Sequence, residues 1–208
     1  MKYNKKSLFI SFEGPEASGK STQINLLKNF FRKNKISYLI TREPGGTKTA
    51  EKLRKIILNK NLSITPYEEL LLLMSSRLNH IHNVIKPALK RGKIVVSDRF
   101  ADSTFVYQGY ANKIGLKKSM KLHKEILNNF LPSKTFLFLL PSNEINKRLK
   151  KRKIKNKYDK SNLNFHNNIL SGYKKLSNKN KRFILIDATQ PKSIIQNNII
   201  EVMKKLIK

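Results

Sequence analysis

Residues 8–21, LFISFEGPEASGKS, decide how the rest of this 208-residue sequence is interpreted. An apolar run at 8–12 leads into a loop of the form G-x-x-x-x-G-K-[ST], and a helical pattern begins at about Lys20. A strand, a glycine-bearing loop and a helix in this order form a phosphate cradle, because the loop N–H groups and the positive helix N-terminus face the same anion. A chance glycine-rich turn is the weaker interpretation. The stretch predicts a nucleoside triphosphate site.

Two side chains of this loop have specific roles in phosphate chemistry. Lys20 can bridge the β- and γ-phosphates, and the Ser21 hydroxyl can ligate Mg²⁺, the cofactor expected beside ATP. The expected ATP contacts from this stretch are Gly14, Pro15, Glu16, Ala17, Ser18, Gly19, Lys20, Ser21 and Thr22.

Three charged residues follow two other apolar runs. Asp98 ends the run at 94–97, where an acid at the tip of a parallel strand can hold Mg²⁺ directly or through water. An N-cap is the alternative role for this aspartate. Arg99 follows it, and Arg42 follows the run at 38–41 before a Pro-Gly-Gly turn. We expect both arginines to contact a phosphate, with an ordinary surface arginine as the alternative for Arg42.

The pattern of apolar runs predicts the fold class. Strands are expected at 8–12, 38–41, 94–97, 135–140 and 183–186, with helical patterns after Lys20 and at 67–90, 116–129 and 194–207. Nearly continuous apolar strands alternating with amphipathic helices favour a doubly wound parallel sheet with helices on both faces. We therefore expect one α/β domain over residues 1–208, built on a five-stranded sheet.

The charge is the least usual feature of the composition. There are 44 Lys and Arg against 13 Asp and Glu, a formal net charge of +31. Such a balance fits a polynucleotide-binding protein. It also fits an enzyme with a solvated lysine coat, since only nine of the cations are arginine and the lysines accompany many Asn and Ile residues. A basic segment at 147–160, KRLKKRKIKNKYDK, could be a solvated helix end, a mobile flap or a polynucleotide patch.

The composition excludes several classes of protein. The sequence has no cysteine, which excludes a disulfide framework, a cysteine-based zinc site and a cysteine nucleophile. No apolar run is long enough to span a membrane, and the short run after the N-terminal lysines lacks a signal-peptide pattern. We expect a soluble cytoplasmic protein whose four histidines have ordinary surface or packing roles.

Longer motifs add a resemblance to a known family. They are FEG at 12–14 leading into the loop, TREPGGT at 41–47, residues 70–77, and DRFADSTFVYQG at 98–109. Over nearly the whole chain the sequence resembles the thymidylate kinases, P-loop nucleoside monophosphate kinases whose signature is D-R-[YF]-x-x-S-x-x-Y-Q-G. The resemblance implies transfer of phosphate from ATP–Mg²⁺ to dTMP, and a homodimer formed through apolar-faced helices such as 67–90.

The resemblance also implies an acceptor site. Arg42 and Arg99 match arginines that hold the dTMP phosphate, and Arg77 matches the arginine that reads thymine. The other matched dTMP-binding positions are Glu16 near the 3′-hydroxyl, Tyr107 near the sugar, and Ser103 and Gln108 beside the base. Leu73 stands where the family has a phenylalanine that stacks on thymine.

The basic segment matches the position of the family's lid, which we place at about 147–162. Ala17 stands where other members have a P-loop arginine, so we expect Arg148 and Arg152 of the lid to contact the phosphates of ATP, with Lys153 and Lys160 behind them. The expected catalytic set is Lys20, Asp98, Arg99 and Arg152, and the expected metal ligands are Ser21 and Asp98.

Three alternatives to a dTMP kinase remain open at the sequence level. Another nucleoside or nucleotide kinase would use the same loop. A nucleic-acid-binding P-loop ATPase would use the lysine coat and show steep salt dependence, and a binding module would keep the loop without transfer. The paired arginines and the motif at 98–109 favour the kinase, so we expect ATP and dTMP as partners, with no specific nucleic acid and no membrane.

Overall fold

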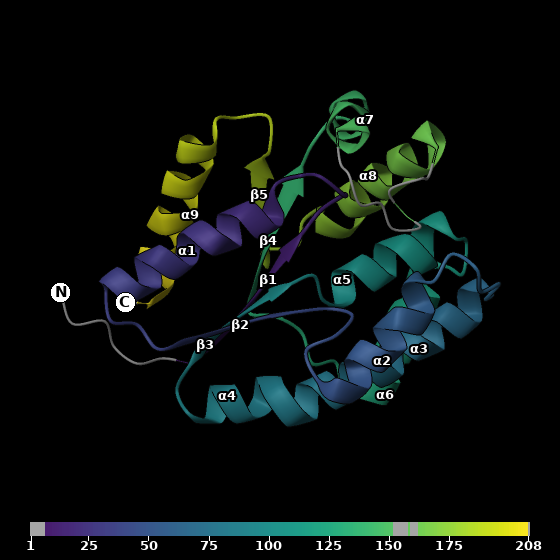
Figure 1. Ribbon diagram of the computed structural model, residues 1–208, viewed down its shortest axis with the longest axis horizontal. Coiled ribbons are helices and arrows are strands. Elements are labelled where there is room, and N and C mark those ends of the chain that lie inside the picture. The colour runs from purple at the N-terminus through teal and green to yellow at the C-terminus, as the bar shows by residue number, and fades with distance from the viewer. Residues whose placement is uncertain (1–6, 152–157, 159–161, 208) are drawn as a thin grey trace.

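The computed structural model describes residues 7–151, 158 and 162–207, and its centre is a parallel sheet (Figure 1). Within these residues the sheet has five strands in the order β2-β3-β1-β4-β5, and every pairing is parallel. The strands are β1 (Leu8–Glu13), β2 (Tyr38–Arg42), β3 (Ile94–Asp98), β4 (Lys134–Leu139) and β5 (Phe183–Asp187). The predicted fold class is confirmed, and each predicted strand is present within about a residue or two of its expected ends.

The strand register brings the candidate site together at one edge. Phe12 of β1 pairs with Asp98 of β3, and Arg42 of β2 pairs with the same aspartate. The carboxyl ends of these three strands therefore lie side by side. In an open parallel sheet, ligands bind beyond this edge where the strand order reverses, which here is beside β1.

Helices cover both faces of the sheet (Figure 1). Alternate residues of a strand point to opposite faces, so Ile10 packs in one apolar cluster with residues of α1, α7 and α9. Phe9 packs in a second cluster with residues of α3, α6 and α8. The helical segments are α1 (Lys20–Lys33), α2 (Lys48–Leu58), α3 (Pro66–His80), η1 (Ile81–Ile85), α4 (Lys86–Lys90), α5 (Ala101–Thr104), η2 (Phe105–Ala111), α6 (Leu116–Leu127), α7 (Ser142–Lys150), α8 (Leu163–Ser177) and α9 (Lys192–Ile207).

The predicted helical pattern at 67–90 forms a nearly continuous helical rod. α3 begins with a capping box, in which Thr65 Oγ1 accepts from Glu68 N and the Glu68 carboxylate accepts from Thr65 N. Pro66 occupies the first helical position, where its missing N–H costs no hydrogen bond. A π-helical turn, η1, then joins α3 to α4. Within the described part of the chain, no helix combines the length and apolarity that crossing a bilayer requires.

Candidate active site

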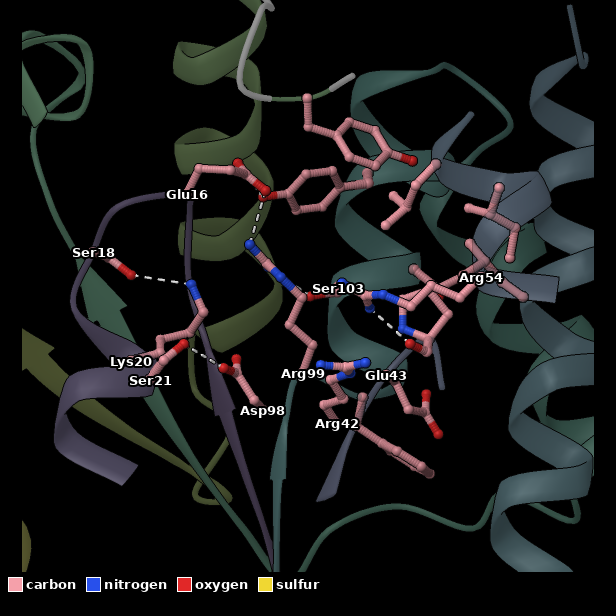
Figure 2. A pocket seen from close by; sticks show the side chains of 18 of the residues that line it. Glu16, Ser18, Lys20, Ser21, Arg42, Glu43, Arg54, Asp98, Arg99 and Ser103 are labelled. Atoms are coloured by element: carbon pink, nitrogen blue, oxygen red, sulfur yellow. Dashed lines mark hydrogen bonds and ion pairs between the residues drawn. The ribbon is translucent and has the colours of Figure 1, made fainter. Parts of the chain in front are cut away.

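A cleft of about 410 Å³ opens at the carboxyl ends of β1, β2 and β3 (Figure 2). The glycine-bearing loop and the start of α1 form one side, and α2, α3 and η2 contribute to the other. Among its described lining residues are five cations, Lys20, Arg42, Arg54, Arg77 and Arg99, and three acids, Glu16, Glu43 and Asp98. Such an excess of positive charge in a concave site favours anionic ligands.

The loop before α1 has the form of an anion cradle. Gly14 has φ +136°, and a Cβ there would lie 2.4 Å from Phe138 O, so the loop fits against β4 only with glycine. Gly19, at φ +92°, turns the chain into α1. Lys20 Nζ donates to Gly14 O at 3.1 Å and to Pro15 O at 2.7 Å. Burial, together with the charge of Arg99, lowers the pKa of Lys20 to about 8.

Ser21 and Asp98 meet below this loop. The Ser21 hydroxyl donates a 2.7 Å hydrogen bond to Asp98 Oδ2, which joins the first turn of α1 to the end of β3. A hydroxyl and a carboxylate at one point are hard oxygen ligands of the kind that Mg²⁺ binds together with substrate phosphates. The donor set therefore fits the expected cation.

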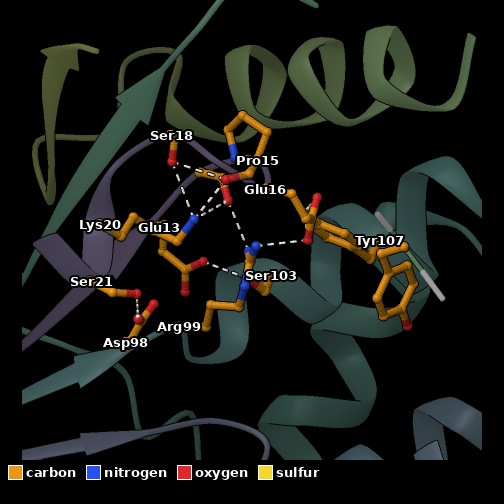
Figure 3. A network of polar contacts seen from close by, with 12 residues as sticks. Glu13, Pro15, Glu16, Ser18, Lys20, Ser21, Asp98, Arg99, Ser103 and Tyr107 are labelled. Atoms are coloured by element: carbon orange, nitrogen blue, oxygen red, sulfur yellow. Dashed lines mark hydrogen bonds and ion pairs between the residues drawn. The ribbon is translucent and has the colours of Figure 1, made fainter. Parts of the chain in front are cut away.

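Arg99, whose side chain is 19% exposed, is the centre of a largely buried polar network (Figure 3). Its Nη1 donates to Gly14 O at 2.8 Å, and its Nη2 donates to Glu16 Oε1 at 2.8 Å. Tyr107 OH donates to both Glu16 oxygens, at 2.9 and 2.7 Å. Burial would raise the pKa of Glu16, but the charges of Arg99 and Lys20 outweigh it and lower that pKa. The network orients Arg99 toward the loop that would hold ATP.

Glu13 lies beneath this network and is fully buried. Its carboxylate accepts from Phe100 N and from Ser103 Oγ, both at 2.6 Å, and from Tyr173 OH at 3.1 Å. Burial and the nearby charge of Asp102 raise the pKa of Glu13 to about 7. Glu13 thus fixes Ser103, whose hydroxyl also accepts from Arg99 Nη1 at 3.0 Å.

The other three arginines that line the cleft differ in how far their side chains are exposed. The Arg42 side chain is 56% exposed, and its Nη2 contacts both Glu51 oxygens at 3.1 and 3.0 Å. Arg54 Nη1 donates to Pro44 O at 2.7 Å. Arg77 is buried and donates from Nε to Glu43 Oε2 at 2.6 Å.

Gln108 closes the far end of the cleft. Its Nε2 donates to Glu69 Oε1 at 3.1 Å and to Tyr158 OH at 3.2 Å. Tyr158 belongs to the predicted lid segment, lines the cleft, and packs edge-on against Tyr107 at 5.2 Å between ring centroids. Leu73 lines the same end, where the family resemblance placed a phenylalanine.

Most of the residues predicted from sequence line this one cleft. They are Glu16, Ala17, Ser18, Gly19, Lys20, Ser21, Thr22, Arg42, Arg77, Asp98, Arg99, Ser103, Tyr107 and Gln108. Gly14 and Pro15 are not among the lining residues, but their carbonyl oxygens hold Lys20. Arg148 lies outside the lining and donates to Ala17 O at 3.3 Å and Ala188 O at 3.1 Å. Arg152, Lys153 and Lys160 lie outside the described residues.

Sequence reasoning gave no role to Glu13, Glu43 or Arg54, and it gave His80 only an ordinary surface or packing role. Glu13 and Glu43 stand inside the quoted motifs, so their position beside Gly14 and Arg42 was an available signal. Arg54 interrupts an amphipathic stretch just after the Pro-Gly-Gly turn, which is a weaker signal. His80 is fully buried and hydrogen-bonded at both ring nitrogens, a pairing that no local pattern indicates.

Fold and site together define a P-loop nucleotide kinase. The family model for thymidylate kinase matches residues 12–199. The thymidylate kinase of Thermoanaerobacter sp. (strain X514) is 40% identical over 203 residues, covering 97% of this chain and all of that protein. That of Mycoplasma capricolum is 40% identical over 205 residues, covering 97% and 96%. A crystal structure of thymidylate kinase from Ehrlichia chaffeensis superimposes with a TM-score of 0.74 at 29% identity, covering 95% of this chain and 98% of that one. The chain belongs to the thymidylate kinase family.

Proposed function

We propose that this protein transfers the γ-phosphoryl group of ATP to dTMP. An oxygen of the dTMP phosphate forms a bond to the γ-phosphorus, the bond from that phosphorus to the β–γ bridging oxygen breaks, and ADP and dTDP leave. The observation that carries the proposal is that the phosphate cradle and four arginines, Arg42, Arg54, Arg77 and Arg99, line one cleft. The acceptor oxygen is already anionic, so the reaction needs positioning and charge stabilisation more than a strong base.

The donor side of the cleft would hold ATP. The loop N–H groups and Lys20 would bind the β- and γ-phosphates, and Lys20 would exchange its bonds to loop carbonyls for bonds to phosphate oxygens. Ser21 and Asp98 would hold Mg²⁺. When bound, this cation neutralises charge on the transferring phosphate.

The acceptor side would hold dTMP. Arg99 and Arg42, joined by Arg54, would bind its dianionic phosphate through guanidinium forks, which suit bidentate phosphate contacts. Glu16 and Tyr107 would contact the sugar. We place the thymine at the other end of the cleft, beside Leu73, with Arg77, Ser103 and Gln108 as its polar contacts.

The segment at about 147–162 would be a lid within a single domain. The first residues of this segment form the end of α7. There Arg148 donates to the carbonyl oxygen of Ala17 in the glycine-bearing loop. From there Arg148 would contact the ATP phosphates. The matching role of Arg152 stays a sequence-based prediction.

We further propose that the protein acts as a homodimer with α3 in the interface. Leu71 is 55% exposed and Leu78 is 37% exposed. Seven residues apart on one helix, they lie on the same face. Light scattering should give twice the chain mass, and Leu71→Glu should give the mass of one chain.

The function is tested by ADP release with ATP–Mg²⁺ and a panel of nucleoside monophosphates. We expect kcat/KM to be highest for dTMP. Equal turnover of several monophosphates would replace this proposal with a broader nucleotide kinase. ATP hydrolysis that depends on added DNA or RNA, with no monophosphate acceptor, would favour the nucleic-acid-binding ATPase instead.

A further inference from the structure

The Arg77 guanidinium is held by a carboxylate that is itself held by an imidazole. Glu43 Oε2 accepts from Arg77 Nε at 2.6 Å, and Glu43 Oε1 accepts from His80 Nδ1 at 3.0 Å. The side chains of all three residues are 3% exposed or less. Because each carboxylate oxygen has its own donor, the plane of the carboxylate is fixed in two places.

The second imidazole nitrogen extends this chain of contacts. His80 Nε2 lies 2.7 Å from Thr41 Oγ1. Thr41 lies in β2 and Glu43 directly follows that strand, whereas Arg77 and His80 lie on α3, one turn apart. The imidazole therefore cross-links the end of β2, which carries Arg42, to the helix that carries Arg77.

The loop that follows Glu43 packs closely against the His80 ring. A Cβ at Gly46 would lie 2.5 Å from His80 Nε2 and 2.8 Å from Thr41 Oγ1. Gly46 also has φ +89°, a left-handed conformation that favours glycine. The ring thus has little freedom to turn away from Glu43.

The two outer nitrogens of Arg77, Nη1 and Nη2, have hydrogen-bond acceptors of different quality. Nη2 donates to Thr104 Oγ1 at 2.8 Å, whereas Nη1 has a described contact at 3.9 Å to Met74 Sδ, a weak acceptor. Arg77 lines the cleft. A hydrogen-bond acceptor on a bound ligand would therefore improve the contacts of Nη1 more than those of the other Arg77 donors.

We propose that His80 is a positioning residue for acceptor recognition. Its Nδ1–H fixes the Glu43 carboxylate, and that carboxylate sets the plane in which Arg77 meets the acceptor base. This inference rests on the proposed function. Because no P-loop group takes part in these contacts, a change at His80 should raise the KM for dTMP and spare the KM for ATP.

The test compares His80→Asn with His80→Gln, since an asparagine amide nitrogen can donate to Glu43 in place of Nδ1, whereas the glutamine amide reaches the position of Nε2, where its oxygen can accept from Thr41. His166→Gln is the matched control, because His166 is also fully buried and its ring nitrogens have no partner among the described residues. We expect His80→Gln to raise the KM for dTMP about tenfold, with kcat and the KM for ATP changed less than about twofold. His80→Asn should raise it less than about threefold.

A second background separates positioning from general destabilisation. In an Arg77→Ala protein, His80→Gln should not raise the KM for dTMP further, because the group it positions is gone. His166→Gln should leave both KM values unchanged whatever its melting temperature. Equal KM values for dTMP in His80→Asn and His80→Gln, or an undiminished His80→Gln effect without Arg77, would overturn the inference. Failure of the unaltered protein to phosphorylate dTMP would instead reject the proposed function.

Discussion

Ser21 Oγ lies 2.7 Å from Asp98 Oδ2, although 77 positions separate the two residues in the chain. The first turn of α1 supplies the hydroxyl and the last residue of β3 supplies the carboxylate. Neither side chain could hold a divalent cation well alone, because Mg²⁺ takes several oxygen ligands. The pairing of β1 with β3 therefore creates the candidate metal site.

Removing this hydroxyl should weaken the response to Mg²⁺. We expect Ser21→Ala to raise the Mg²⁺ concentration for half-maximal ADP release by about tenfold, the loss of roughly 1.4 kcal/mol of binding. Ser21→Thr keeps a hydroxyl and is the matched control, which should stay within about threefold. A Mg²⁺ titration at fixed ATP measures both. The same half-maximal concentration in Ser21→Ala and in the unaltered protein would contradict a ligand role for Ser21.

Lys20 should be needed for turnover and not for folding. Its buried ammonium contacts loop carbonyls, and burial lowers its pKa to about 8, so the folded protein gains little from the charge. We expect Lys20→Ala to lower kcat about a thousandfold, with the far-ultraviolet circular dichroism unchanged. Lys33→Ala, at the exposed end of the same helix, is the control. Activity of Lys20→Ala near that of Lys33→Ala would remove Lys20 from the mechanism.

The fold could be predicted because its strands have a strong local signal. β1 and β3 are buried almost throughout, so their sequences are continuous apolar runs. The phosphate cradle was predictable for a related reason, since its function needs glycines and a lysine at fixed spacing. α8 was not recognised, because its apolar residues follow a basic segment and are interspersed with Asn and Lys residues.

Side-chain contacts between residues far apart in the sequence were harder to predict. The contacts from Glu43 to Arg77 and His80 span 34 and 37 positions, and they depend on how β2 and α3 pack. Arg54 reaches the cleft only because α2 turns back against α3 after the Pro-Gly-Gly turn. A motif shows that a residue matters for a family, but it does not show which neighbour orients it.

Glu13 should make stability depend on pH. Burial raises its pKa from 4.5 to about 7, so between these values the folded protein holds a proton that the unfolded chain has released. This contribution to the free energy of unfolding is fully present below about pH 4.5 and is lost as the pH rises through 7. It amounts to about 3 kcal/mol at most. Glu13→Gln should remove this pH dependence.

Urea unfolding at several pH values between 4.5 and 8 measures the effect. Glu125→Gln is the control, because the Glu125 side chain is 57% exposed. It should follow the unaltered protein throughout this pH range. If Glu13→Gln and the unaltered protein lose stability in parallel as the pH rises, the titrating group lies elsewhere.

Asp102 and Arg182 should contribute to stability without affecting substrate binding. Asp102 is fully buried, and its two oxygens accept from Arg182 Nη1 and Nη2, each at 2.7 Å. Arg182→Met would leave this carboxylate buried without its cation, which costs about 3–5 kcal/mol in comparable pairs. Because Arg182 does not line the cleft, the KM values for both substrates should change less than about twofold.

The double variant Asp102→Asn/Arg182→Met distinguishes an uncompensated charge from lost packing. Asparagine carries no charge, and its oxygen can still accept from Thr135 Oγ1, which donates to Asp102 Oδ2 at 3.1 Å. We therefore expect the double variant to recover at least half of the unfolding free energy lost in Arg182→Met, as measured by urea denaturation. If it recovers none, the loss comes from the arginine's contacts with Thr135 and Phe183, and the buried charge is not its source.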